Sequence, residues 1–104
     1  MALPTVEFAA SFRGLAHLEG GMPAYSVPWD ISARGAIVVG ESQSANGREA
    51  YRWSADTGMV ALGSLGGADF FSTAWRISTE GLVIAGASRS PSSGTRTEAF
   101  RWTA

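Results

Sequence analysis

Short apolar runs separated by glycine-containing turns dominate the chain, and they predict β-strands. Residues 36–42 are β-branched and almost wholly apolar, which favours a strand covered on both faces. We expect further strands near residues 25–32, 49–53 and 59–65. These four runs predict a unit of four short strands.

The connections between these runs are typical of tight turns. The sequence Ala33-Arg34-Gly35 predicts a turn in which Gly35 takes a positive φ, which only glycine adopts readily. The sequence Ala45-Asn46-Gly47 ends in a dipeptide strongly disposed to a hairpin turn. The predicted strands are therefore neighbours in an antiparallel arrangement.

The pattern occurs twice, at a period of about 46 residues. Seven residues of the first unit return in the second in the same order: Ser26, Trp29, Ile31, Ser32, Gly35, Gly40 and Ser42 recur as Ser72, Trp75, Ile77, Ser78, Gly81, Gly86 and Ser88. The block Glu49-Ala-Tyr-Arg-Trp returns as Glu98-Ala-Phe-Arg-Trp after a longer Ser/Pro/Gly loop at residues 89–97. Stacked repeats tolerate such an insertion when it is confined to one loop.

We therefore expect an all-β fold of two four-stranded antiparallel repeats of the β-propeller blade type. Residues 1–104 form one repeat domain, with the first repeat at about 19–65 and the second at about 66–104. An N-terminal strand at about 12–18 is expected to complete a blade, in cis or in trans. Two blades cannot close a ring, since propellers have about four or more. The expected partners are copies of the chain in a ring-closing homo-oligomer, or the rest of a longer repeat array.

Three blocks carry a family resemblance. They are Leu62-Gly-Ser-Leu-Gly-Gly, the stretch from Ser72 to Ser88, and Glu98-Ala-Phe-Arg-Trp, with a weaker copy between Leu15 and Trp53. In this order the blocks resemble the HAF repeat, a family of bacterial repeats. The resemblance implies a propeller-like array that is extracellular or at the cell surface, with no catalytic residues to carry over.

Composition narrows the class of partner. Of the residues, 45% are hydrophobic and 16% charged, with a net charge of −1, which is a globular composition. The basic residues are all arginines, scattered singly from Arg13 to Arg101. We therefore expect no nucleic-acid binding, which requires a concentrated basic face.

Two further function classes receive no support from the sequence. The absence of cysteine excludes disulfides and thiolate ligands, and there is a single histidine, so we expect no metal site and no cofactor. No stretch approaches the roughly 18 apolar residues of a spanning helix, so we expect no membrane insertion. The stretch from Met1 to Phe8 lacks the basic and apolar regions of a signal peptide.

No residues form a recognisable catalytic set, and we expect no enzyme activity. His17 lies between Leu15 and Leu18, where a structural or solvent-facing role is expected. Glu49 and Glu98 occupy equivalent places in different units, whereas a glycosidase needs two carboxylates about 5 to 10 Å apart across one sugar bond. Both glutamates are therefore interpreted as repeated structural groups.

The aromatic residues are the remaining candidates for binding. Trp53 and Trp102 lie in the most regular block and are expected to pack in the core. Four aromatic residues are candidate ligand contacts: Trp29, Trp75, Phe70 and Phe71. The two tryptophans have charged neighbours, and two adjacent phenylalanines cannot both point inward on a strand.

Taken together, the sequence predicts a non-catalytic β-propeller-type repeat module that acts as a binding or structural element at the cell surface. Two alternatives remain open: a lectin-like carbohydrate binder, or a fragment of a propeller glycosidase. Repeated exposed Trp faces would favour the sugar binder, whereas a cleft with paired carboxylates would favour the enzyme.

Overall fold

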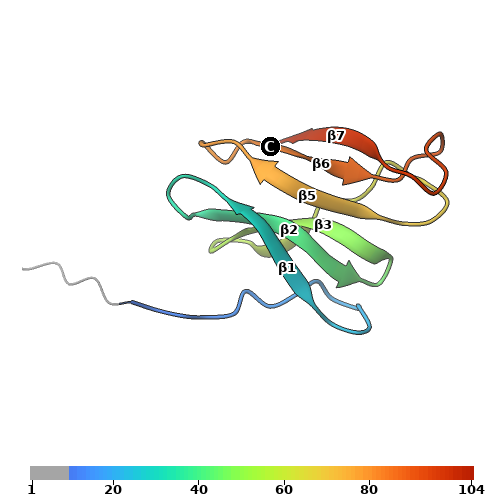
Figure 1. Ribbon diagram of the computed structural model, residues 1–104. Coiled ribbons are helices and arrows are strands. Elements are labelled where there is room, and N and C mark those ends of the chain that lie inside the picture. Colours follow the sequence, from blue (N-terminus) through green and yellow to red (C-terminus); the bar gives the residue numbers. More distant parts are fainter. Residues whose placement is uncertain (1–9) are drawn as a thin grey trace, which may run out of the picture.

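The computed structural model of the chain describes residues 10–104 and has seven β-strands and no helix over that range. The strands are β1 (Ser26–Ile31), β2 (Ile37–Ser44), β3 (Gly47–Ser54), β4 (Gly58–Ala61), β5 (Ser72–Ile77), β6 (Val83–Ser88) and β7 (Glu98–Thr103). They form two antiparallel sheets, β1-β2-β3-β4 and β5-β6-β7, each in sequence order (Figure 1). The predicted all-β class is confirmed. Across this part of the chain, no helix is available to cross a membrane.

The first two strands of each sheet are joined by the same tight turn. Gly35 has a φ of +72°, and its N–H donates to the carbonyl oxygen of Ser32 at 2.8 Å. Gly81 has a φ of +81°, and its N–H donates to the carbonyl oxygen of Ser78 at 2.9 Å. The turn predicted at Gly35 is thus confirmed, and the second unit repeats it.

A β-bulge lies in the first strand of each hairpin that contains this turn. The pairing register of β1 with β2 shifts at Trp29, and that of β5 with β6 shifts at Trp75, so each tryptophan is the extra residue of a bulge. The partner strand approaches closely at Gly40 and Gly86. A Cβ atom there would lie 1.9 Å from a carbonyl oxygen of β1 and 2.0 Å from one of β5, respectively. Only glycine fits either position.

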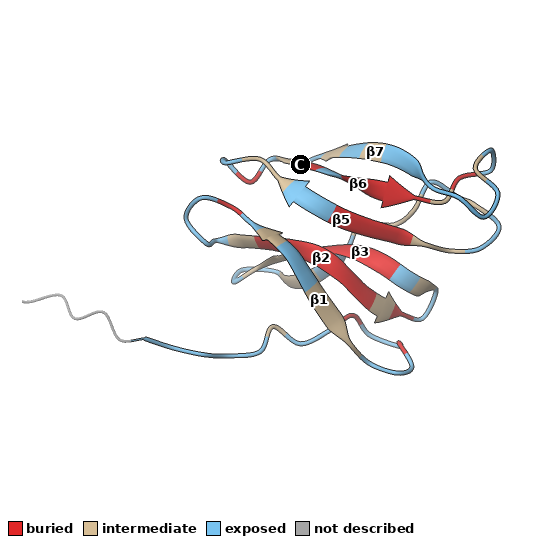
Figure 2. Cartoon of the chain, viewed as in Figure 1, coloured by how far each residue is buried: buried red, intermediate tan, exposed pale blue. Residues whose placement is uncertain are grey.

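Buried apolar side chains form two clusters. The cluster between the sheets comprises Val39, Ala50, Ala74 and Ile84. The cluster on the outer face of the first sheet comprises Leu18, Val38 and Tyr51. Because Val38 and Val39 are neighbours on β2, they point to opposite faces, and the predicted double coverage of this strand is confirmed. Figure 2 shows buried stretches along β2, β3, β5 and β6, whereas β7 is largely exposed.

The N-terminal strand is the main difference from expectation. Residues 12–18 form no strand in the structure, and the second sheet has three strands where the first has four. Completion of the second unit in cis is therefore not found, since no segment of residues 10–104 pairs with the outer edge of β7, and completion in trans stays a prediction. The stretch from Met1 to Phe8, on which the absence of a leader was predicted, lies outside the described residues.

Candidate functional site

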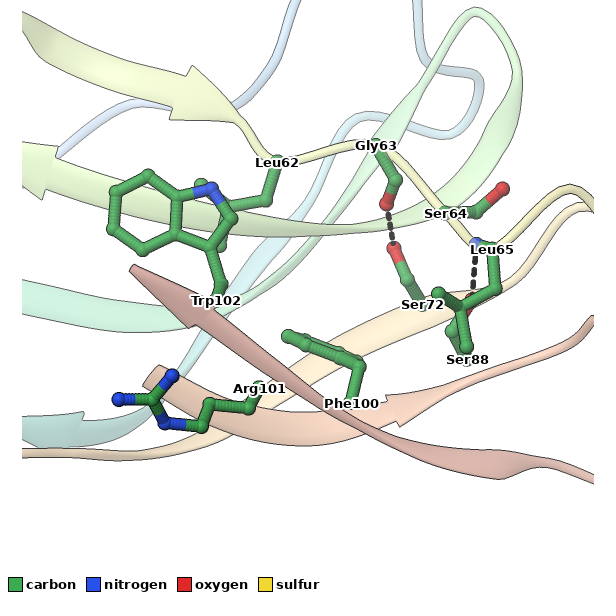
Figure 3. Close-up of a pocket in the computed structure, with 9 residues that line it drawn as sticks. All are labelled: Leu62, Gly63, Ser64, Leu65, Ser72, Ser88, Phe100, Arg101 and Trp102. Carbon is green, nitrogen blue, oxygen red and sulfur yellow. Dashed lines mark hydrogen bonds between the residues drawn. The ribbon is translucent and has the colours of Figure 1, made fainter. Parts of the chain in front are cut away.

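A pocket of about 130 Å³ lies between β7 and the segment that follows β4. Figure 3 shows Phe100 and Trp102 projecting from β7 towards Leu62 and Leu65, while the side chain of Arg101 points to the other face of the strand. The wall is therefore mainly apolar, as expected of a site that accepts an apolar or aromatic group.

Two buried serines form the polar end of this pocket, and both hold backbone groups. Ser72 Oγ donates to the carbonyl oxygen of Gly63 at 2.6 Å and accepts from the Ala50 N–H at 2.9 Å (Figure 3). Ser88 Oγ accepts from the Leu65 N–H at 2.9 Å. These hydroxyls fix the loop after β4 against the second sheet, and each is already engaged in hydrogen bonds.

The first unit repeats these contacts with its own serines. Ser26 Oγ donates to the carbonyl oxygen of Ala16 at 2.6 Å, as Ser72 Oγ donates to that of Gly63, the equivalent residue. Ser42 Oγ accepts from the Leu18 N–H at 2.9 Å. The recurring serines of the sequence therefore recur as one hydrogen-bonding arrangement, which explains their conservation between the two units by architecture.

A larger and more open hollow of about 440 Å³ lies beside Trp29. Its other lining residues include Leu15, Pro28, Asp30 and Val38. Trp29 is 48% exposed and is the extra residue of the bulge in β1. This hollow combines an aromatic face with a carboxylate, which is a pairing that can stack on a sugar ring and hydrogen-bond its hydroxyls.

Trp75 is placed in the same way in the second sheet but lines neither hollow. It is 49% exposed at its own bulge, and its carbonyl oxygen accepts from Arg76 Nη1 at 2.9 Å. The two candidate tryptophans are thus equivalent in backbone position and different in surroundings. Trp29 is the stronger candidate of the two.

The phenylalanine candidates have structural neighbours. Phe71 is half-buried between two guanidinium groups, those of Arg48 and Arg89, each 5.6 Å from the ring centre. Phe70 is also half-buried and lies against Gly47, where an added Cβ atom would sit 3.3 Å from the Phe70 carbonyl oxygen. Both residues pack the second unit onto the β2–β3 hairpin of the first, and neither lines the pocket beside β7 or the hollow beside Trp29.

Glu41 is a buried charged residue that the sequence interpretation missed. Its side chain accepts from Trp29 Nε1 at 3.1 Å and from Thr73 Oγ1 at 3.1 Å, and it pairs with Arg48 Nε at 3.0 Å. This carboxylate therefore joins the two sheets and orients the exposed indole. The available signal was a glutamate within an otherwise apolar strand, at a position where the second unit has Ala87.

The remaining carboxylates show no paired arrangement. Glu49 is buried and accepts from Ser44 Oγ at 2.7 Å and from the Gly63 N–H at 3.0 Å, so it has the expected structural role. Glu98 is exposed at the start of β7. Asp30 accepts from the Ile77 N–H at 2.8 Å, and this hydrogen bond holds the pKa of Asp30 below its usual value.

Neither a metal cluster nor a catalytic triad is assembled in residues 10–104. No three His, Cys, Asp or Glu side chains of that range gather where a metal ion could bind. His17 Nδ1 lies 3.0 Å from the carbonyl oxygen of Leu18. His17 does not line the pocket that contains Ser72 and Ser88. No protein-family model, curated protein or solved structure matches the chain.

Proposed function

We propose that the chain is a non-catalytic repeat module of the β-propeller type that acts as a structural or binding element. The observation that carries this proposal is the repeated use of the same polar side chains to fix backbone. Ser26 and Ser72 make the same hydrogen bond at the same distance, as do Ser42 and Ser88. Hydroxyl groups used in this way in every unit are architectural.

The strand order supports the blade interpretation. The first sheet is a meander of four antiparallel strands in sequence order, which is the arrangement of a propeller blade. The second sheet packs its first strand, β5, against β1, β2 and β3 of the first. Units that stack on their neighbours in this way bury a continuous core only in an array.

The carboxylates support a module without catalysis. Glu41 and Glu49 are buried and each accepts several hydrogen bonds that hold other parts of the fold. A general acid needs access to substrate, and neither buried side chain offers it. The resemblance to the HAF repeat supports a location outside the cell or at its surface.

A panel of chromogenic glycosides and esters tests the absence of catalysis. We expect no turnover above the buffer rate. Turnover that disappears in Glu98→Gln, which removes the exposed carboxylate at the start of β7, would overturn the proposal and favour a glycosidase. Turnover unaffected by that substitution would also overturn it and would place the chemistry elsewhere.

Carbohydrate binding is the second candidate function, and the hollow beside Trp29 favours it. An exposed indole held by Glu41 at 3.1 Å offers a fixed face for stacking on a sugar ring. A glycan array followed by tryptophan-fluorescence titration tests this. We expect Trp29→Ala to abolish any binding and Trp75→Ala, the matched exposed tryptophan outside the hollow, to retain it.

A further inference from the structure

Equivalent positions are buried in the first unit and exposed in the second. Glu49 and Ala50 on β3 are buried, whereas their counterparts Glu98 and Ala99 on β7 are exposed. The difference arises because β3 is covered by β4 and β5, while in the described part of the chain β7 has a strand neighbour on one side only. The second unit therefore presents an uncovered copy of a surface that the first unit buries.

The uncovered side of β7 carries the same two hydrogen-bond acceptors that β3 uses in the first unit. In the first unit, the Ala50 carbonyl oxygen accepts from the Leu62 N–H at 2.9 Å and the Glu49 carboxylate accepts from the Gly63 N–H at 3.0 Å. The same two groups of Ala99 and Glu98 have no hydrogen-bond partner among residues 10–104. An exposed strand edge of this kind is a template for another strand.

The pocket of the second unit marks the place of a missing side chain. In the first unit, Met59 of β4 lies opposite Trp53 and packs on the cluster around Tyr51. The pocket is lined by the equivalents of that cluster, including Phe100 and Trp102, but no β4-like strand within residues 10–104 supplies the equivalent of Met59. The hole in the second unit thus corresponds in position to one apolar side chain.

The N-terminal segment has the conformation of the missing strand's end. Ala16 has a φ of +68°, where the equivalent Gly63 has +87°, and Ala16 is the one non-glycine residue with positive φ in the described chain. Its carbonyl oxygen is held by Ser26, as that of Gly63 is held by Ser72, at 2.6 Å in both units. Residues 15–18 therefore already lie as residues 62–65 do.

The residue that corresponds to Met59 in this alignment is Phe12. Its side chain is fully exposed, at 106% of the reference area, on a segment that extends away from the first sheet (Figure 2). A fully exposed phenylalanine ahead of a preformed segment, and an apolar pocket that lacks one side chain, are complementary parts. Phe12 and the pocket lie at opposite units of the chain. One molecule can therefore insert its Phe12 into the pocket of a neighbour while its own pocket receives the Phe12 of another copy.

From this complementarity we infer that a second copy of the chain docks head to tail on β7, with its residues 11–14 pairing antiparallel to β7 and its Phe12 filling the pocket. The inference rests on the proposed function, since it extends the stacking of repeat units from one chain to the next. The contact is heterologous, and such contacts form closed rings or open filaments. A propeller of about four to eight blades corresponds to a ring of roughly two to four copies.

One pair of charges opposes this docking. In the first unit, Arg52 lies opposite Val60, and its guanidinium group lies 6.0 Å from the ring centre of Trp102. In the docked pair, Arg101 of one copy lies opposite Arg13 of the other, and like charges directly opposite on two strands are destabilising. We therefore expect Arg13→Val, which introduces the residue found at the equivalent position, to tighten association and added salt to do the same.

Sedimentation equilibrium of the full chain over a wide concentration range tests the inference. We expect a mass that rises with concentration to a multiple of the chain. Phe12→Ala should raise the dissociation constant by at least about tenfold, because it removes the side chain that fills the pocket. Val60→Ala, which trims an exposed apolar side chain outside the pocket, should assemble as the unaltered chain does.

A monomer at every concentration, or a Phe12→Ala variant that assembles normally, would overturn the inference. Circular dichroism of the same samples shows whether each variant is folded, and Phe12 is exposed enough that its removal should leave the fold unchanged. Hydrolase activity is measured on the same samples. Turnover would overturn the proposed function, whereas a folded monomer without turnover would overturn only the docking.

Cross-linking provides a second and independent measurement. The register of β3 with β4 pairs Ser54 with Gly58, so the docked copies should pair Thr103 with Ser11. The chain has no cysteine, so Ser11→Cys and Thr103→Cys chains can be mixed and oxidised without interference. We expect a disulfide-linked pair, since directly opposed strand residues have the Cα separation that a disulfide needs. Equal cross-linking of Ser11→Cys with Ser92→Cys, in an exposed loop, would refute the register.

Discussion

Replacing Ser72 by alanine is the sharpest test of how the two units are joined. Ser72 Oγ donates to the Gly63 carbonyl oxygen and accepts from the Ala50 N–H, so its removal leaves two backbone groups unsatisfied. The side chain is almost fully buried, at 1% exposure, which limits access of water to those groups. An unsatisfied buried polar group costs about 1–3 kcal/mol, so with two such groups we expect Ser72→Ala to destabilise the fold by about 2–6 kcal/mol.

That loss is large relative to the stability of the whole chain. Domains of this size are stable by about 5–15 kcal/mol, and 1 kcal/mol shifts Tm by roughly 4–8 °C. Urea unfolding followed by tryptophan fluorescence, at two protein concentrations to separate folding from association, measures the change. A matched control is Ser26→Ala, which removes one hydrogen bond at a half-buried position and should cost about 0.5–1 kcal/mol.

The comparison between the two serines decides the outcome. If Ser72→Ala were no more destabilising than Ser26→Ala, the hydroxyl would not hold the two units together, and the account of the recurring serines would be refuted. A change in the slope of the urea dependence would instead indicate that the two sheets unfold separately. We expect a single transition with an unchanged slope, because β5 packs directly on β2 and β3.

Three further outcomes follow from the structure. Burial raises the pKa of Tyr51 to about 12, so the unfolded chain loses the phenol proton at lower pH than the folded chain does. The free energy of unfolding should therefore fall as pH rises above about 10. Tyr51→Phe should abolish that loss, measured by urea titrations at about pH 9 and 11. The pKa of Asp30 is lowered chiefly by the Ile77 N–H, so its contribution is present above about pH 4 and is lost as pH falls through the folded-state value; Asp30→Asn should flatten this acid dependence of the unfolding free energy. Gly86→Ala places a methyl group against a carbonyl oxygen of β5 and should cost on the order of 3 kcal/mol, whereas Gly14→Ala, with open space around it, should leave Tm unchanged.

Local features of the fold could be predicted from the sequence because they depend on neighbouring residues. The apolar run through Val38 and Val39 determines a strand buried on both faces, and Gly35 determines its turn. The repeat indicated the corresponding strands of the second unit, since the recurring residues form the same turn and the same bulge in both units. Strand positions in both units were therefore predicted closely.

The failures share a physical cause, which is dependence on distant partners. Residues 12–18 have the pattern of a strand, but a strand forms only against an edge that can accept it, and the matching edge at β7 lies on the other unit. The role of Glu41 depends on Thr73, which is remote in sequence. Trp29 is the extra residue of a bulge, and no residue pattern indicated that bulge. None of these features can be derived from local periodicity.

The close approach at Gly40 and Gly86 determines where the chain tolerates change. In both units the bulged tryptophan and its glycine are the same number of residues apart, because an added or deleted residue would move the glycine away from the carbonyl oxygen that it faces. The connection between the second and third strands has no such constraint, and in the second unit it lengthens to the largely exposed loop of residues 89–97. Foreign peptides for display or affinity capture therefore belong in that loop, where a graft extends into solvent and leaves the paired hairpin intact.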